Sequence, residues 1–208
     1  MYLSRLVLNP RCQQVRSEIL RPYEMHRTIM RAFPADLPDG ERVLYRLDVS
    51  RETGTPTLLV QSITCPAWAF LAQADRYLQP PGDENPAVKE FAPGFTAGQV
   101  LAFRLRANPT VRREGKRLSR FGEEDQQAWL DRKGASGGFR LVTVTMTREG
   151  FQESSKHEDD ERRLCHFAVR FEGVLTVTDP ATFVDTIARG IGPGKAFGFG
   201  LLSVARQD

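Results

Sequence analysis

A proline- and glycine-rich stretch near the middle of the chain constrains the fold more than any other feature. Residues 79–98 (QPPGDENPAVKEFAPGFTAG) include four prolines and three glycines, with little apolar periodicity. Proline fixes φ and lacks an N–H donor, so this stretch predicts a linker or a long surface loop. The parts on either side are each long enough for a small domain. We therefore expect a domain over residues 1–80, a linker over 81–98 and a second domain over 99–208.

The first part has alternating strand and helix signals in the order β-α-β-β-α-β. Asn9-Pro10 is typical of a helix start, and Pro22 is expected to kink or interrupt the helix that follows. Turn residues at 51–54 separate two β-rich runs, which predicts a hairpin. The expected elements are a strand over 2–8, a helix to Phe33, strands over 43–49 and 57–63, a short helix over 66–74 and a strand over 76–78.

The second part repeats that order. A helix over 123–133 has acids at its start, bases at its end and Gly134 as a stop. Asp179-Pro180 predicts the start of a short helix that ends at Arg189-Gly190. Strands are expected over 99–106, 139–146, 166–177 and 201–205, with a solvated hairpin tip over 148–163. Two such units predict an α+β fold of two tandem ferredoxin-like (RRM-like) domains.

Composition restricts the setting in which the chain works. The net charge is only +3, so a polyanion site has to come from clustered cations. No apolar run approaches the roughly 20 residues of a membrane span, and Asn9, Pro10 and Arg11 interrupt any signal-peptide core. The three cysteines have no close pairing, which favours a reducing compartment over a disulfide or zinc role. We therefore expect a cytoplasmic protein that does not associate with a membrane.

The segment from Pro22 to Arg27 carries the most informative side chains. At about 100° per residue, Tyr23, His26 and Arg27 share one helical face, and Met25 lies on the opposite side. Histidine exchanges protons near neutral pH, and arginine holds phosphate with a fork of donors. This pattern fits a catalytic site, but it also fits a solvated helix face or a face buried against the second domain.

Cations are concentrated over residues 104–120, where seven bases accompany a single acid, Glu114. Asn108-Pro109 and Gly115 indicate a strand followed by a flexible loop. Such clustering suits a phosphate backbone, although an ordinary solvated loop is the alternative. The candidates for RNA binding are Arg104, Arg106, Arg112, Arg113, Lys116 and Arg117.

The segment from Gly190 to Gly200 holds five glycines just before the last strand. It matches neither a P-loop nor a G-x-G-x-x-G motif. Its backbone can approach another surface closely and present N–H groups to phosphate, although tight turns explain most glycine clusters. His157 falls in an acidic loop, and His166 and Cys165 point to opposite faces of a strand. The sequence therefore predicts neither a metal site nor a cofactor.

Together these features resemble the CasE family of CRISPR RNA endonucleases, subunits of the type I-E Cascade complex. The similarity covers essentially the whole chain and is strongest at its ends and in the glycine-rich segment. The residues that carry it are Leu6–Pro10, Pro22–Arg27, Phe103–Pro109, Gly115–Arg117, Phe171–Gly173, and Gly190–Gly200 followed by Leu201–Val204.

The resemblance implies a specific activity. Members of this family bind the stem-loop of a precursor CRISPR repeat, cleave at the 3′ base of the stem and retain the product within the complex. The partners would thus be repeat hairpin RNA and other Cascade subunits. By the same resemblance Tyr23 and His26 form the catalytic pair, with no metal ion and the RNA 2′-hydroxyl as nucleophile. A phenol with a pKa of about 10 is a poor base, which favours His26 for proton transfer. Our own assignment adds Arg27 and Lys195 as groups that stabilise charge on the phosphate.

Two other functions remain open at this point. A non-catalytic subunit that only holds a guide RNA would have the same fold, although the pairing of Tyr23 with His26 argues against it. An RRM-type or ribosomal module would be expected to have two aromatic-rich strands per sheet, and the sequence does not contain them.

Overall fold

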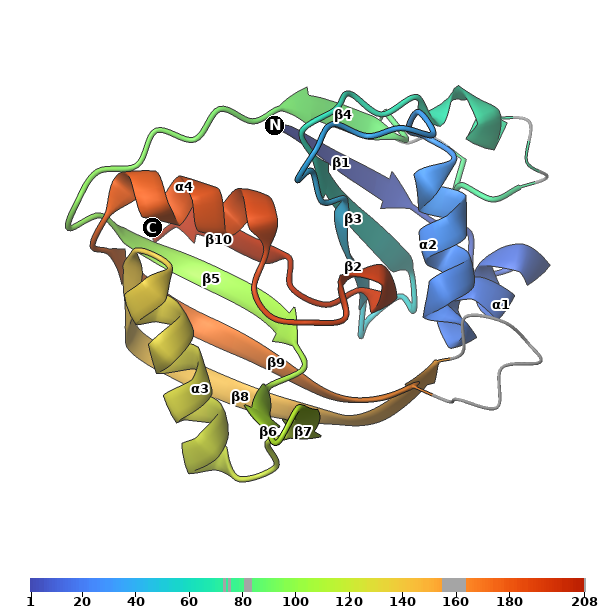
Figure 1. Cartoon of the computed structure of the whole chain (residues 1–208). Coiled ribbons are helices and arrows are strands. Elements are labelled where there is room, and N and C mark those ends of the chain that lie inside the picture. The colour runs from blue at the N-terminus through green and yellow to red at the C-terminus, as the bar shows by residue number, and fades with distance from the viewer. Residues whose placement is uncertain (73, 75, 81–83, 155–163, 208) are drawn as a thin grey trace. The chain divides into compact units, whose positions relative to one another are not determined.

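The computed structural model describes residues 1–72, 74, 76–80, 84–154 and 164–207, and it describes the backbone only for Lys116, Arg117, Glu153, Ser154 and Leu164. The chain forms two compact units (Figure 1). The first comprises Met1–Ala92 together with Ala196–Gly198, and the second comprises Pro93–Lys195 and Phe199–Asp208. Three residues of the glycine-rich segment therefore pack with the first unit, although they lie more than a hundred residues further along the chain.

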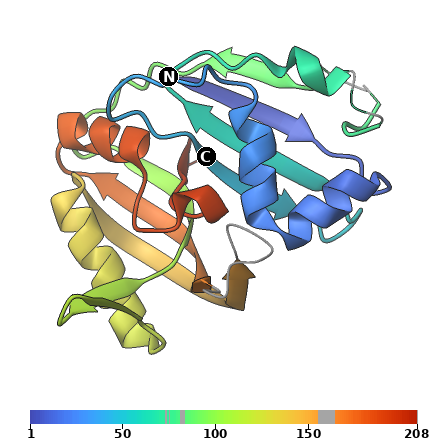
Figure 2. The same ribbon diagram turned by 45° about the vertical axis from the view of Figure 1, so that its right-hand side comes forward.

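The first unit is a four-stranded antiparallel sheet in the order β2-β3-β1-β4, which is the strand order of a ferredoxin-like fold. Helices α1 and α2 pack on one face of this sheet (Figures 1 and 2). The elements are β1 (Tyr2–Val7), α1 (Gln13–Leu20), α2 (Pro22–Met30), β2 (Leu44–Val49), β3 (Pro56–Ser62), the 3₁₀ helix η1 (Trp68–Ala72) and β4 (Ala87–Glu90).

Three expectations for this unit are confirmed and one is wrong. The first strand, the helix interrupted at Pro22 and the β2–β3 hairpin are present. Residues 76–78, expected to form the last strand, contribute only a single bridge between Leu8 and Leu78. The fourth strand is β4, inside the expected linker, where it pairs with β1 at the sheet edge. Proline is tolerated there because an edge strand leaves N–H groups unpaired, and Pro86 comes just before the strand.

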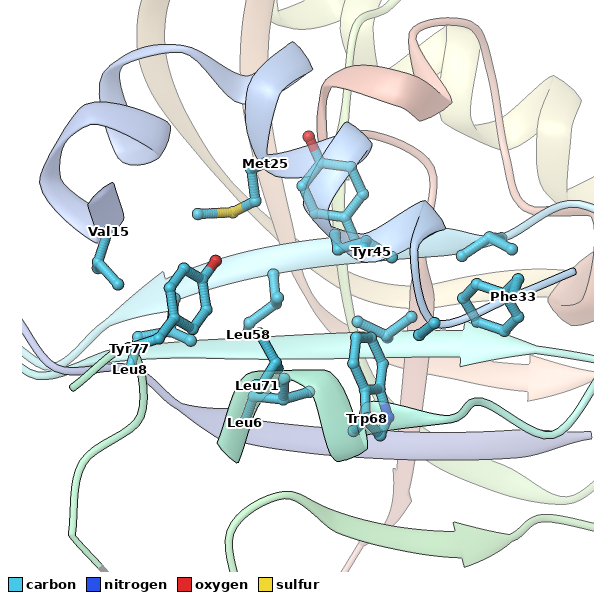
Figure 3. Packing of buried hydrophobic residues seen from close by; sticks show 14 residues of the cluster. Leu6, Leu8, Val15, Met25, Phe33, Tyr45, Leu58, Trp68, Leu71 and Tyr77 are labelled. Carbon is cyan, nitrogen blue, oxygen red and sulfur yellow. The ribbon is translucent and has the colours of Figure 1, made fainter. Parts of the chain in front are cut away.

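A cluster of buried apolar side chains joins the helices of this unit to the sheet (Figure 3). Met25 and Ile29 project from α2 onto Leu58 and Val60 of β3. The opposite side of α2 is thereby turned away from the core, as its sequence pattern predicts. Glu18 of α1 is also buried, and its carboxylate accepts hydrogen bonds from Thr28 of α2 and from Tyr77.

The second unit has the same topology, with an antiparallel sheet in the order β10-β5-β9-β8 and helices on one face (Figure 1). The two sheets and their helices make the fold α+β, with the tandem ferredoxin-like arrangement that was predicted. The elements are β5 (Val100–Ala107), β6 (Thr110–Arg113), β7 (Lys116–Ser119), α3 (Glu123–Ser136), β8 (Phe139–Ser154), β9 (Leu164–Val177), α4 (Pro180–Arg189), the 3₁₀ helix η2 (Lys195–Phe197), which crosses between the units, and β10 (Leu202–Arg206).

Several boundaries in the second unit differ from those expected. Helix α3 does not stop at Gly134 but continues to Ser136 and is followed by Gly137. Gly134 instead permits close packing, since a Cβ there would lie 2.7 Å from the carbonyl oxygen of Phe139. Strand β8 extends to Ser154, well into the stretch expected to be a hairpin tip, and β9 begins at Leu164, two residues earlier than expected. Residues 155–163 of that stretch lie outside the described part of the chain. The predicted cap of α4 is confirmed, since the Asp179 carboxylate accepts from the N–H groups of Ala181 and Thr182.

The basic segment is a β-hairpin and not the flexible loop that was expected. Strands β6 and β7 pair with Arg113 opposite Lys116, which leaves a two-residue turn of Glu114 and Gly115. Both turn residues have positive φ, at 49° and 75°, as a type I′ turn requires. The hairpin therefore has a defined backbone register, with Arg112 opposite Arg117 and Arg113 opposite Lys116.

Candidate active site

Helix α2 positions Tyr23 and His26 on the side that faces away from the apolar core. It begins at Pro22, whose fixed φ and missing N–H suit the first helical position. Met25, Thr28 and Ile29 are buried, whereas Tyr23 and His26 are half-buried. The ring centroids of Tyr23 and His26 are 6.0 Å apart. The structure thus brings together the two residues that the sequence singled out as a pair.

The imidazole of His26 lies in a restricted environment. It is nearly parallel to the ring of Tyr45 on β2, with 16° between the planes and 6.3 Å between centroids. Its Nδ1 atom is buried and has no hydrogen-bond partner within the described residues. Burial disfavours the imidazolium form and so lowers the pKa of His26 below its ordinary value of 6.5. At neutral pH His26 is therefore an uncharged imidazole that can accept a proton.

Two aromatic residues that the sequence analysis did not identify complete these surroundings. The ring of Phe197, from the glycine-rich segment, lies 5.9 Å from that of Tyr23. The hydroxyl of Tyr45 lies 2.7 Å from the carbonyl oxygen of Pro22 and 3.2 Å from that of Ala196. Tyr45 falls in the run 43–49 that was expected to form a strand, but no sequence signal connects it with Ala196, 151 positions away.

Arg27 and Lys195 each interact with a group of their own unit. The guanidinium of Arg27 is two-thirds exposed and forms an ion pair with Glu24 at 3.0 Å, one turn earlier on α2. Lys195 belongs to the second unit, where its ammonium group donates to the carbonyl oxygen of Gly192 at 3.0 Å. An exposed ion pair contributes little stability, so a phosphate can displace Glu24 from Arg27 at low cost.

The predicted RNA-binding cations fall into two groups. Arg104 and Arg106 lie on β5 and pair with carboxylates of the same sheet, Arg104 with Glu172 of β9 and Arg106 with Glu149 of β8, both at 2.6 Å. Both arginines are therefore already paired with acids. Arg112 and Arg113 lie on the β6–β7 hairpin and are exposed, and their strand partners are Arg117 and Lys116.

The glycines before the last strand serve close packing. A Cβ at Gly192 would lie 3.1 Å from the Trp129 ring, and one at Gly194 would lie 2.9 Å from that of Phe199. Gly198, in the first unit, has φ of +78°, and a Cβ there would lie 3.1 Å from the Tyr45 ring. Of the two alternatives that the sequence left open, these close approaches favour a structural role for much of the segment.

The remaining candidates form no further site in the described part of the chain. Nδ1 of His166 lies 2.9 Å from the side-chain amide nitrogen of Asn108, and His157 lies outside the described residues. Among the described residues no three histidine, cysteine or acidic side chains are placed to share a metal ion. No helix in the same residues is long and apolar enough to cross a membrane.

Comparisons with known proteins agree with this arrangement. A family model described as "CRISPR associated protein" matches residues 1–206. The CRISPR-associated endoribonuclease Cse3 of Thermus thermophilus is 42% identical, with 99% of this chain and 100% of the relative covered. The Cascade subunit CasE of Escherichia coli is 30% identical, with 99% of each chain covered. A structure of Cse3 bound to a 19-nucleotide RNA superimposes with a TM-score of 0.87 at 41% identity, covering 99% of this chain and 100% of the other. The chain therefore belongs to the CasE family of CRISPR-associated endoribonucleases.

Proposed function

We propose that this chain is an endoribonuclease that binds the hairpin of precursor CRISPR repeat RNA, cuts it at the 3′ base of the stem and keeps the product as a Cascade subunit. The observation that carries the proposal is the pairing of Tyr23 with an uncharged His26 on the side of α2 that faces away from the core. Two relatives support it by name, one as an endoribonuclease and one as a Cascade subunit. The similar Cse3 structures include one with an RNA that represents a pre-cleavage complex.

In the proposed reaction the RNA supplies its own nucleophile. His26 accepts the proton of the 2′-hydroxyl next to the scissile phosphate, and the resulting 2′-oxygen forms a bond to phosphorus. The bond from phosphorus to the 5′-oxygen breaks, and that oxygen takes up a proton from water, while His26 releases its own proton to solvent. The products are a 2′,3′-cyclic phosphate and a 5′-hydroxyl. No metal ion is needed to generate the nucleophile, because a positioned hydroxyl and a base already do so.

We assign the supporting roles as follows. Tyr23 orients the 2′-hydroxyl or donates to a phosphate oxygen, and Arg27 and Lys195 stabilise the charge that develops there. The β6–β7 hairpin binds the stem. In that hairpin Arg112 is paired with Arg117 and Arg113 with Lys116, so cations lie on directly opposite residues. Like charges in these positions repel each other, and a bound phosphate backbone relieves the repulsion. Arg104 and Arg106 bind RNA only after phosphate replaces their carboxylate partners.

We place this activity in the cytoplasm. Cys12, Cys65 and Cys165 form no disulfide with one another, which is consistent with a reducing compartment.

The test is incubation of the purified protein with end-labelled repeat RNA in excess chelator. We expect a single cut at the 3′ base of the stem and a cyclic phosphate on the upstream fragment. A 2′-deoxy nucleotide immediately 5′ of the scissile phosphate removes the nucleophile and should abolish cleavage without abolishing binding. Binding of the unmodified RNA without a cut product would identify a scaffold subunit instead. Cleavage of the deoxy RNA that depends on added magnesium would identify a metal-activated water.

A further inference from the structure

Tyr45 makes contacts that an ordinary core tyrosine does not need. The residue is almost fully buried in β2, with 1% of its surface exposed. Its ring lies alongside His26, and its hydroxyl reaches the backbone at two places. One of these is Pro22, the first residue of the helix that carries His26, and the other is Ala196 in the glycine-rich segment.

The two hydroxyl interactions have unequal strength. A phenol has one proton to donate, and the 2.7 Å approach to Pro22 is the shorter of the two. The 3.2 Å approach to Ala196 is then the weaker branch of a shared hydrogen bond. The stronger bond holds the first turn of α2 against β2, four residues before His26.

The ring of Tyr45 is itself held in place by a glycine. A Cβ at Gly198 would lie 3.1 Å from Cε2 of this ring, so the ring would have to move by a few tenths of an ångström to admit a larger residue. The φ of Gly198 is +78°, which side chains other than glycine rarely adopt. The preceding residue, Phe197, packs against Tyr23. The segment Ala196–Gly198 therefore contacts Tyr45 and also Tyr23, the partner of His26 in the proposed catalytic pair.

From these observations we infer that Tyr45 is a positioning residue for RNA cleavage: its ring sets the plane of the His26 imidazole and its hydroxyl fixes the start of α2. The inference rests on the proposed function, because it concerns the same site. A buried side chain can hold a base in this way because small displacements of a reacting group reduce the rate strongly. Tyr45 itself touches neither the RNA nor the reacting atoms in this proposal.

The test uses two substitutions that separate the hydroxyl from the ring. Tyr45→Phe keeps the ring and removes the hydroxyl, and Tyr45→Leu removes both. The single-turnover cleavage rate is measured at saturating protein, and RNA affinity is measured with the 2′-deoxy substrate. We expect the rate to fall about fivefold for Tyr45→Phe, which corresponds to one neutral hydrogen bond. For Tyr45→Leu we expect a loss of about 100-fold, the scale of a 1 Å misplacement. Affinity should change less than about threefold in both variants, because ground-state binding of the phosphates is unaffected.

Tyr77 provides the matched control. It is equally buried in the same unit (Figure 3). Its hydroxyl donates to the carboxylate of Glu18, a residue of α1 and not of α2. Tyr77→Phe removes the same atom, while Glu18 keeps its hydrogen bonds from Gln14 and Thr28. We expect this variant to lose stability in denaturant but to cleave at the wild-type rate. A rate loss as large as that of Tyr45→Phe would show that any buried tyrosine has this effect, and would overturn the inference.

A spectroscopic measurement covers the possibility that Tyr45→Leu folds poorly. The carbon-bound protons of the His26 ring are shifted in the NMR spectrum by a neighbouring aromatic face, and His26→Ala assigns their signals among the three histidines. Tyr45→Phe should leave them nearly unchanged, and Tyr45→Leu should move them. Unchanged signals in a folded Tyr45→Leu variant would overturn the inference.

His26→Ala, measured in parallel, separates the two possible failures. If His26→Ala cleaves normally, the proposed function of this site is wrong. If His26→Ala is slow and Tyr45→Leu is not, only the role of Tyr45 is wrong.

Discussion

The rings of Tyr23 and His26 lie one turn apart on α2, with 6.0 Å between their centroids. This separation leaves both side chains able to reach groups on one ribose-phosphate unit, and the core side of the helix stays filled by Met25 and Ile29.

The first prediction concerns His26 itself. His26→Ala should lower the cleavage rate by roughly 10²-fold or more, the usual scale for loss of an acid–base group. Binding of the repeat RNA should change little, because an uncharged imidazole contributes little to phosphate binding. Single-turnover kinetics and filter binding on the same preparation measure both. Cleavage by His26→Ala at the wild-type rate would place the active site elsewhere.

The second prediction follows from the lowered pKa of His26. If His26 acts as the base, the cleavage rate should not change with pH near neutrality. It should fall only as the pH approaches the folded-state pKa of His26, which lies below 6.5. A rate that instead rises on acidification would assign His26 to protonating the leaving oxygen.

The same pKa change affects folding stability, and the sign follows from linkage. The folded state holds the proton less tightly than the unfolded state, so acid favours unfolding. The contribution of His26 is fully present above about pH 6.5 and is lost as the pH falls through the folded-state pKa. Urea unfolding between pH 5 and 7 should therefore show a smaller pH dependence in His26→Ala than in the wild type.

The third prediction tests the β6–β7 hairpin. Changing Arg112 and Arg113 to alanine should weaken RNA binding and lower the slope of log affinity against log salt by about 0.7–0.9 for each phosphate that the protein no longer neutralises. The cleavage rate at saturating protein should largely recover, because the hairpin contributes no proton-transfer group. Arg51 and Arg132, both exposed, give a control pair with the same change in charge. Equal salt slopes for the two double variants would make the hairpin an ordinary solvated element.

The fourth prediction concerns Gly173, whose Cα lies against the partner strand at a bulge in β8. The register shifts between Leu141 and Thr143, and a Cβ at Gly173 would lie 2.1 Å from the carbonyl oxygen of Thr143. Gly173→Ala should therefore destabilise the protein by about 1–3 kcal/mol or more in urea unfolding, because backbone has to move. Gly94→Ala is the control, since a Cβ there meets nothing within 4 Å and needs no positive φ. If Gly173→Ala is as stable as Gly94→Ala, strands β8 and β9 can move apart at this point with little loss in the free energy of unfolding.

Features that depend on local order along the chain could be predicted from the amino-acid sequence. The apolar periods of α2 and β2, the proline at the start of α2 and the Asp179 cap are local signals, and the structure has these elements in place. Helical spacing likewise put Tyr23 and His26 on one face, because three residues make nearly one turn.

The residues that surround that face become known only from the folded chain. Tyr45 meets His26 and Ala196, which lie 19 and 151 positions away in the chain, and no periodicity encodes such distances. The same holds for β4, whose strand character comes from pairing with β1 and not from its own proline-flanked sequence. Arg104 and Arg106 looked like available cations because their carboxylate partners lie on strands 40 or more residues away. Strand pairing brings distant residues into contact, and so the partners of each candidate residue emerge only when the chain has folded.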